Sequence, residues 1–340
     1  MSLDLNAVWF FLVALLLAGY ALLDGFDLGV GALHLFAEKD EDRRVLLNAI
    51  GPVWDGNEVW LLTAGGAVFA AFPPVYATVF SGFYLALMLL LVALIARAVA
   101  IEFRSKQPMP LWRSFWDRAF AAGSILAAVL LGVAFGNLVR GVPVGADGEF
   151  AGAFFGLLHP YPLLMGFFAL ALFALHGALY LTLKTEGALL EKARGWARKA
   201  FDLFAAVFIA MMACTLFFIP RIGRALGEHP LLLLAPLAAI LAVANLRREL
   251  CRGRDFQAFL SSCALILALA AFFAGGMFPA LVYSLPEAQN SLSAYNASSS
   301  QKTLAIMLVI AGLGMPLVIA YKAFVYWVFR GKVTLGPASY

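Results

Sequence analysis

The chain has 340 residues, of which 63% are hydrophobic and only 13% are charged, and its mean hydropathy is +0.90. Soluble globular proteins carry roughly 25% charged residues, so this composition excludes a soluble fold and indicates that lipid surrounds most of the surface. The net charge of +4 is modest, and the basic residues occur in short segments between apolar runs. Such residues are typical of topology signals and not of a nucleic-acid surface, so no nucleic-acid partner is expected.

Long apolar runs follow one another along the chain. A helix needs roughly 20 residues to cross about 30 Å of hydrocarbon. Runs of this order lie at 7–35, 47–72, 76–102, 116–140, 157–183, 199–221, 230–246, 257–282 and 303–329. They show no strand-like alternation, and a helix satisfies its own backbone hydrogen bonds in lipid. We therefore predict an all-α, polytopic protein of about nine transmembrane helices, with residues 1–340 forming one membrane-embedded domain.

The Lys and Arg residues are divided unevenly between the two sides of the predicted bundle. Of the 24, all but Arg140, Arg221, Arg224 and Lys302 lie on the side that holds the first connection and the C-terminus. The positive-inside rule places that side in the cytoplasm. We predict an N-terminus outside and a C-terminus in the cytoplasm, an arrangement that an odd number of helices permits.

A weak internal similarity indicates a duplication. Leu23-Asp24-Gly25 and Leu175-His176-Gly177 lie at similar depths in their helices. This favours a pseudo-repeat of residues 1–140 and 157–282, followed by a final helix at 303–329, that is, two four-helix bundles plus one extra helix. Between the helices we expect an amphipathic cytoplasmic extension at 184–199, a brief loop at 221–230 and an external loop at 285–301.

Four acidic residues lie inside apolar helices. Asp24 and Asp27 are three residues apart in the first predicted helix, and Asp55 and Glu58 are three apart in the second, so each pair shares a helical face. At 1.5 Å per residue all four lie roughly 12 to 17 Å from the cytoplasmic surface. The two helices are joined by a short loop and should be antiparallel neighbours. The acids are therefore expected to converge.

Two explanations of these acids remain open. An ionised carboxylate at such depth costs about 2.5–3.5 kcal/mol on insertion scales, so each must pair, line water or be protonated. One explanation is a proton path open to the cytoplasm, which Asn57 would extend as a hydrogen-bonding group. The other is a buried network that locks the helices together, with close approach at glycines such as Gly29 and with Arg97 neutralising one acid.

The remaining candidates are weaker. His176 lies inside a predicted helix, where a lone histidine is more often a satisfied hydrogen-bonding residue than a ligand. No spaced histidine or cysteine motif occurs, so no metal or haem held wholly by this chain is expected. Trp54 and Trp60 flank the acids and serve either as packing anchors or as walls of a route for a small apolar molecule. The charged residues at 102–118 are expected to form a solvated loop with local ion pairs.

Several motifs together resemble subunit II of cytochrome bd-type quinol oxidase. They are LDGFDLGVG at 23–31, GPVWDGNEVWLLTAGGAVFAAFP at 51–73, RAVAIEFRSK at 97–106, FWDRAFAAGS at 115–124 and GVAFGNLVRGVP at 132–143. Their order and spacing also match, and the similarity is dense through about residue 190. One departure is the short segment between the sixth and seventh helices, which leaves open whether this chain binds a structural quinone.

The resemblance implies a role in an enzyme complex of a bacterial or archaeal cytoplasmic membrane. Such an enzyme oxidises quinol, reduces dioxygen to water and generates proton-motive force. Subunit I would carry the quinol site, two b-type haems and one haem d, and a small single-helix accessory subunit can accompany the pair. No catalytic residue is assigned to this chain. The implied proton path comprises Asp55, Asp24 and Asp27, with Glu58 and Asn57 beside them, and Trp60 would lie near an oxygen route.

A second class of function remains open from the residues alone. Buried acids near a helix junction are also typical of a proton-coupled secondary transporter that acts without a partner. Copurification with a haem-bearing membrane subunit would distinguish the two.

Overall fold

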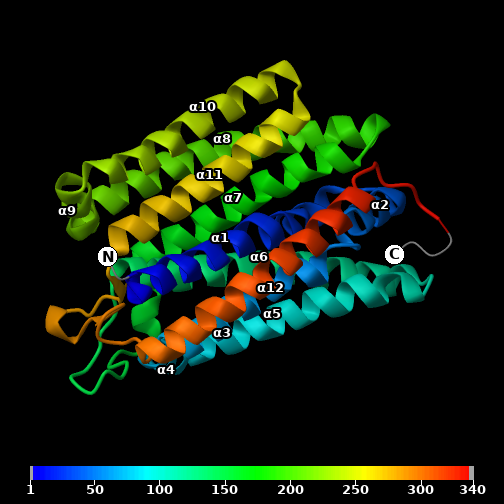
Figure 1. The fold of residues 1–340 in the computed structure, drawn as a ribbon. Helices are drawn as coiled ribbons and strands as arrows, with labels where there is room; N and C mark the ends of the chain where they lie inside the picture. Colours follow the sequence, from blue (N-terminus) through cyan, green and yellow to red (C-terminus); the bar gives the residue numbers. More distant parts are fainter. Residues whose placement is uncertain (1–2, 337–340) are drawn as a thin grey trace.

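The long helices run side by side along one common direction, as Figure 1 shows for the computed structural model. The structure describes residues 3–336. Helix α1 begins at the end of the bundle where the N-terminus lies, and α12 ends at the opposite end. This arrangement agrees with an odd number of crossings.

The first half of the chain contains the elements up to residue 140. They are α1 (Leu5–Leu33), η1 (His34–Phe36), α2 (Asp40–Ile50), α3 (Trp54–Ala71), α4 (Pro73–Gly82), α5 (Tyr84–Phe103), η2 (Arg104–Lys106) and α6 (Pro110–Arg140). Helix α1 is the centre of this half, because it packs against both α3 and α6, and α5 packs against α6.

The second half contains four long helices, an end loop and a final helix. The elements are η3 (Phe154–Leu157), α7 (Pro160–Lys184), α8 (Gly187–Phe218), α9 (Pro220–Glu228), η4 (Pro230–Leu233), α10 (Leu234–Arg252), α11 (Asp255–Met277), β1 (Ala280–Val282), η5 (Ala288–Asn290), β2 (Leu292–Ser293) and α12 (Gln301–Val328). Helices α7, α8, α10 and α11 pack together, α7 and α11 also contact α1, and α12 lies beside α3. The predicted fold of two four-helix groups plus one helix is confirmed.

Eight helices of residues 3–336 are long and apolar enough to cross a membrane. They correspond to eight of the nine predicted segments. The other segment, 47–72, contains α3, which has 18 residues and whose first turns carry Asp55, Asn57 and Glu58. These polar residues lower the hydropathy of α3, although it runs alongside α12 for most of its length (Figure 1).

Two segments predicted as continuous helices are interrupted. Segment 47–72 breaks at residues 51–53, between α2 and α3, and segment 76–102 breaks at Phe83, between α4 and α5. The first break contains Pro52, which has no N–H to donate to a carbonyl of the preceding turn, and Val53 then leaves helical geometry. The acids of α3 therefore lie in the first turns of a new helix and not within a longer one.

Helices α1 and α7 are in backbone contact where two glycines face each other. A Cβ built on Gly29 would lie 1.8 Å from the carbonyl oxygen of Phe173, and one on Gly177 would lie 2.5 Å from the carbonyl carbon of Gly29. Neither position tolerates a larger side chain. The two halves of the chain therefore come into backbone contact close to Asp27 in α1.

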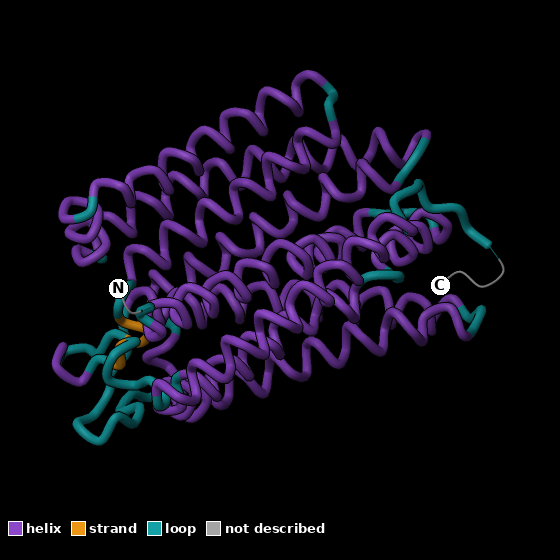
Figure 2. Tube along the Cα trace, in the orientation of Figure 1, coloured by secondary structure: helices purple, strands orange, loops and turns teal. Residues whose placement is uncertain are grey.

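The connections at the N-terminal end are more structured than predicted. Segment 221–230 is largely helical, as α9, and the loop at 285–301 contains η5 and β2, which pairs antiparallel with β1 (Figure 2). The Tyr295 hydroxyl donates to Asp4 Oδ2 at 2.9 Å and ties this loop to the start of α1. Backbone N–H groups of the first turn and this hydroxyl lower the pKa of Asp4. At the other end, most of the segment 184–199 is helical and forms the first part of α8, which begins at Gly187; its location in the cytoplasm stays a prediction.

Candidate functional site

Arg97 of α5 holds two of the predicted acids. Its Nη2 donates to Asp24 Oδ1 at 2.6 Å, and its Nη1 donates to Asp24 Oδ2 at 3.4 Å and to Glu58 Oε2 at 3.3 Å. The Arg97 and Asp24 side chains are fully buried, whereas Glu58 is 23% exposed. The guanidinium also lies 6.0 Å from the ring centroid of Trp54. One cation thus joins α1, α3 and α5.

Asp27 lies one turn further along α1 and belongs to a different set of contacts. Its Oδ2 accepts a hydrogen bond from Asn57 Nδ2 at 2.8 Å. Its Oδ1 is buried and has no hydrogen-bond partner within residues 3–336. Asp27 is fully buried and contacts no arginine directly, so one of its oxygens is available to take up a proton or to bind a water molecule.

Asn57 connects Asp27 to the last helix. The Asn57 side-chain oxygen accepts hydrogen bonds from Lys322 Nζ at 3.1 Å and from Tyr326 Oη at 3.0 Å. The Asn57 Nδ2 also donates to the carbonyl of Leu23 at 3.2 Å. The amide therefore uses both of its ends, and it links α1, α3 and α12 through one side chain.

Asp55 lies apart from the buried acids. It is in the first turn of α3, and its side chain is exposed on the outside of the described chain. Within residues 3–336 it forms no hydrogen bond or ion pair, although it is near enough to Lys322 for an electrostatic interaction. The structure thus brings Asp24, Asp27, Asn57 and Glu58 together, as predicted, and leaves Asp55 at the outer edge of the cluster.

The two tryptophans of α3 pack against other helices. Trp54 contacts the buried core and lies near Arg97, as described above. Trp60 is half-buried and covers Gly19 of α1, where an added Cβ would lie 2.5 Å from the indole ring. Both positions fit the packing-anchor explanation, and the oxygen route past Trp60 stays a prediction.

A second charged cluster lies nearer the C-terminal end of the bundle. His34 Nε2 donates to Asp117 Oδ1 at 2.6 Å, and Arg104 Nε donates to the same oxygen at 2.5 Å. Arg43 Nη1 donates to Asp117 Oδ2 at 2.8 Å. Arg104 and Asp117 are each only 1% exposed. The prediction that the charged residues of 102–118 are solvated is therefore wrong for these two, because α6 begins at Pro110 and carries Asp117 inward.

His176 of α7 is fully engaged by neighbours within the chain. Its Nε2 donates to the carbonyl of Leu22 at 3.0 Å, and its Nδ1 is hydrogen-bonded to Ser262 Oγ at 2.7 Å. The ring stacks on Phe259, with centroids 4.9 Å apart and an angle of 6° between the planes. Neither ring nitrogen of His176 is free to ligate iron, so His176 and its neighbours do not fit a haem site.

Two residues of the cluster, Lys322 and Tyr326, escape prediction from the sequence. Lys322 is a basic residue within the apolar run 303–329, and its position favours a topology signal near the end of a helix. One feature of the sequence could have identified Lys322. A lone cation within an apolar helix is energetically costly, so it needs a nearby carboxylate or amide partner. Only the packing of α12 beside α3 identifies that partner.

The cluster separates two kinds of carboxyl group. Asp24 has a bidentate arginine partner, and such pairs are strong and geometrically specific. Asp27 is hydrogen-bonded at one oxygen and unpaired at the other, and Asp55 is accessible from outside. Chemically, this arrangement can hold a proton on Asp27 while Arg97 keeps the surrounding charge balanced.

Comparisons with known proteins agree with the resemblance noted in the sequence. The family model described as cytochrome bd terminal oxidase subunit II matches residues 5–329. The chain is 35% identical to cytochrome bd-I ubiquinol oxidase subunit 2 of Escherichia coli, with 97% of this chain and 95% of the relative aligned. It is 36% identical to cytochrome bd ubiquinol oxidase subunit 2 of Bacillus subtilis, with 97% of each aligned.

The fold is also similar to a solved structure. A chain of the bd oxidase from Geobacillus thermodenitrificans superimposes with a TM-score of 0.80 at 17% identity, over 96% of this chain and 99% of that one. At this identity the likeness concerns the fold alone. With the family model matched over nearly the whole length and with relatives above 30% identity, the chain belongs to the cytochrome bd terminal oxidase subunit II family.

Proposed function

We propose that this chain is the second subunit of a quinol oxidase that reduces dioxygen to water, and that it works in a membrane complex with subunit I. Family membership and the names of its relatives, which are ubiquinol oxidase subunits, support this function. The multi-pass helical architecture agrees with a bacterial membrane location. A stand-alone transporter is the less favoured alternative, because family membership implies a partner subunit.

The haems of the complex, two b-type and one d-type in this proposal, belong to subunit I. Haem supplies the electron-transfer and oxygen chemistry when it is bound there. In this chain the intramembrane His176 has internal partners on both ring nitrogens. Among residues 3–336 no group of three or more His, Cys, Asp or Glu side chains is placed to hold a metal ion.

Within the complex, this chain delivers protons from the cytoplasm toward subunit I. In this proposal Asp27 is the buried proton carrier, and Asn57 orients it. Asp55 is the carboxyl at the outer edge of the cluster. Asp24 and Glu58 balance the charge of Arg97. The unpaired Oδ1 of Asp27 is the observation that carries this proposal. A buried carboxyl oxygen without a partner is costly to keep, so its presence favours a functional role.

Subunit I covers the face formed by α3 and α12. An exposed carboxylate within the membrane is unfavourable against lipid, and Asp55 projects from this face. Helix α12 is the least buried of the eight apolar helices, because only 6% of its most apolar 18-residue stretch is buried within the chain. A polar partner surface over Asp55 would give the proton a way out of this chain.

The test is the substitution Asp27→Asn in the complete oxidase. Asparagine keeps the size and the hydrogen bond but cannot carry a proton, so quinol-dependent oxygen consumption should fall about tenfold or more. Haem absorption should remain unchanged, because no haem contact is altered. The matched control is Asp202→Asn, which removes a carboxylate that is 67% exposed on α8.

Two results would contradict the proposal. Normal oxygen consumption by an Asp27→Asn complex with a full haem spectrum would exclude Asp27 as a proton carrier and favour the helix-locking explanation. Purification of the chain without any haem-bearing subunit, together with proton-coupled solute uptake in vesicles, would favour the transporter.

A further inference from the structure

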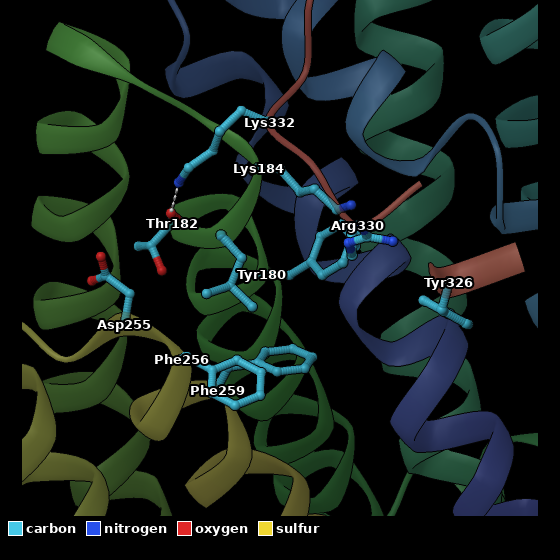
Figure 3. Close-up of a pocket in the computed structure, with 10 residues that line it drawn as sticks. Tyr180, Thr182, Lys184, Asp255, Phe256, Phe259, Tyr326, Arg330 and Lys332 are labelled. Carbon is cyan, nitrogen blue, oxygen red and sulfur yellow. Dashed lines mark hydrogen bonds between the residues drawn. The ribbon is translucent and has the colours of Figure 1, made fainter. Parts of the chain in front are cut away.

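A pocket at the C-terminal end of the bundle borders the acid cluster at Tyr326, which lines the pocket and also donates to Asn57. It has a volume of about 590 Å³ and lies where α7 ends, α11 begins and α12 ends. Figure 3 shows three cations along one edge, Lys184, Arg330 and Lys332, and the aromatic rings of Phe256 and Phe259 along the opposite edge. It is therefore an amphipathic site, charged on one side and apolar on the other.

The cations are held in place by main-chain oxygens. Lys184 donates to the carbonyls of Phe329 and Gly331, Arg330 Nη1 donates to that of Trp327 at 2.8 Å, and Lys332 Nζ donates to that of Thr182 at 3.0 Å. The N–H of Val333 donates back to the carbonyl of Lys184 at 2.9 Å. The segment after α12 is thus fastened to the end of α7, and it positions two of the three charges.

Among residues 3–336 these positive charges are not neutralised by an ion pair. Across the described residues no carboxylate lies in an ion pair with any of the three. The acid in the pocket, Asp255, is occupied by Arg194, whose Nη2 donates to it at 2.7 Å. A lysine has three N–H donors and an arginine five, so several donors remain available to a bound anion.

We propose that this pocket binds a phosphate-bearing anion, and that the anion is the headgroup of an acidic phospholipid of the cytoplasmic leaflet. Lysine and arginine clusters are suited to phosphate, which accepts several charge-assisted hydrogen bonds. The position at the ends of three apolar helices lies at the headgroup layer, where basic pockets between helices bind acidic lipids. The aromatic edge receives the first part of an acyl chain, which free phosphate would leave empty.

This site would fasten the C-terminal segment and α7 to the membrane surface. It does not depend on proton delivery by Asp27. The opposing explanation is that the cations only cap the last carbonyls of α7 and α12, which is common for basic residues at helix C-termini.

The experiment uses the complete oxidase in detergent, with lipid binding measured by native mass spectrometry. Phosphatidylglycerol, phosphatidylcholine and inorganic phosphate are titrated separately. The double variant Arg330→Gln/Lys332→Gln should weaken phosphatidylglycerol binding about tenfold or more. The charge-preserving variant Arg330→Lys/Lys332→Arg should retain it. The matched control is Lys39→Gln/Lys106→Gln, which removes two exposed cations at the same end of the bundle.

Each outcome decides the proposal, provided that the haem spectrum shows an intact complex. Loss of phosphatidylglycerol binding in the glutamine variant alone supports it. Equal binding by the wild type and all variants, or equal affinity for phosphatidylcholine, shows that the cations only cap the helices. Saturable binding of inorganic phosphate without preferential phosphatidylglycerol binding assigns the pocket to free phosphate and overturns the lipid.

Discussion

Arg97 is the residue on which the charge balance of the membrane interior depends. It is fully buried and shared between Asp24 and Glu58. A buried ion pair is often no more stable than a well-packed apolar pair, but removing one partner leaves the other charge uncompensated. The Asp24 side chain is buried with Arg97, whereas the Glu58 side chain is partly exposed and is the more accessible of the two acids.

At this scale we predict the effect of Arg97→Met on stability. The variant leaves Asp24 buried without its cation, which should cost about 3–5 kcal/mol in the free energy of unfolding. The double variant Asp24→Asn/Arg97→Met should recover part of that loss, because neither charge then remains. Thermal inactivation of the complex, followed by its haem absorption, measures the difference.

The control for this prediction is Arg113→Met. Arg113 pairs with Asp40 at 2.9 Å, but both side chains are partly exposed, at 31% and 46%. Such surface pairs contribute about 0–1 kcal/mol. If Arg97→Met were no less stable than Arg113→Met, the ion pair with Asp24 would not stabilise the fold.

At the scale of elements, α3 owes its properties to the break that precedes it. Gly51-Pro52 follows the end of α2, and α3 begins at Trp54 with Asp55 in its first turn and Glu58 in the next. Proline accounts for the break, but the sequence alone does not distinguish a kinked helix from two separate ones. The break allows α2 to pack against the ends of α1 and α7, while Asn57 and Glu58 point toward α1 and α5.

The contact between α1 and α7 leads to a second prediction. Substituting Gly29→Ala places a Cβ 1.8 Å from the carbonyl oxygen of Phe173. Helices α1 and α7 must then separate, which should cost about 1–3 kcal/mol and lower the temperature of thermal inactivation. Because Asp24 and Asp27 lie on the same helix, the oxygen consumption rate should fall as well.

A matched substitution separates this effect from helix propensity. Gly195→Ala lies within α8, where an added Cβ meets no atom within 4 Å. It should raise stability slightly, because alanine favours a helix by about 0.5–1 kcal/mol over glycine. Equal behaviour of the two variants would show that the close approach of α1 and α7 is not required.

At the scale of the whole molecule, the two ends of the bundle differ in charge and in architecture. The end that holds the N-terminus carries β1, β2, α9 and the longer loops, and the opposite end carries α2 (Figure 1). By their positions in the sequence, most of the basic residues lie in the connections at that opposite end. The positive-inside rule therefore continues to predict a cytoplasmic C-terminal end. The pseudo-repeat of 1–140 and 157–282 also stays a prediction.

The orientation can be measured by cysteine labelling of intact cells. Lys106→Cys lies before α6 and Ala146→Cys lies after it, so a membrane-impermeant thiol reagent should label only the second from outside. Permeabilised cells should show labelling at both positions. Labelling of both from the same face would overturn the predicted topology.

The sequence by itself showed that lipid surrounds the chain, and it gave the number of long helices to within one. It also identified the family. These properties follow from the lengths of apolar runs and from specific motifs, which are local features of a sequence. The sequence also identified Asp24, Asp27, Asn57 and Glu58 as neighbours, since two short-linked antiparallel helices place equal depths side by side. Tertiary packing alone decided that Arg97 neutralises Asp24, that Asp55 faces outward and that Lys322 and Tyr326 of α12 reach Asn57. These contacts join residues 73 to 269 positions apart, and only the three-dimensional arrangement of the helices brings such distant side chains within hydrogen-bonding distance.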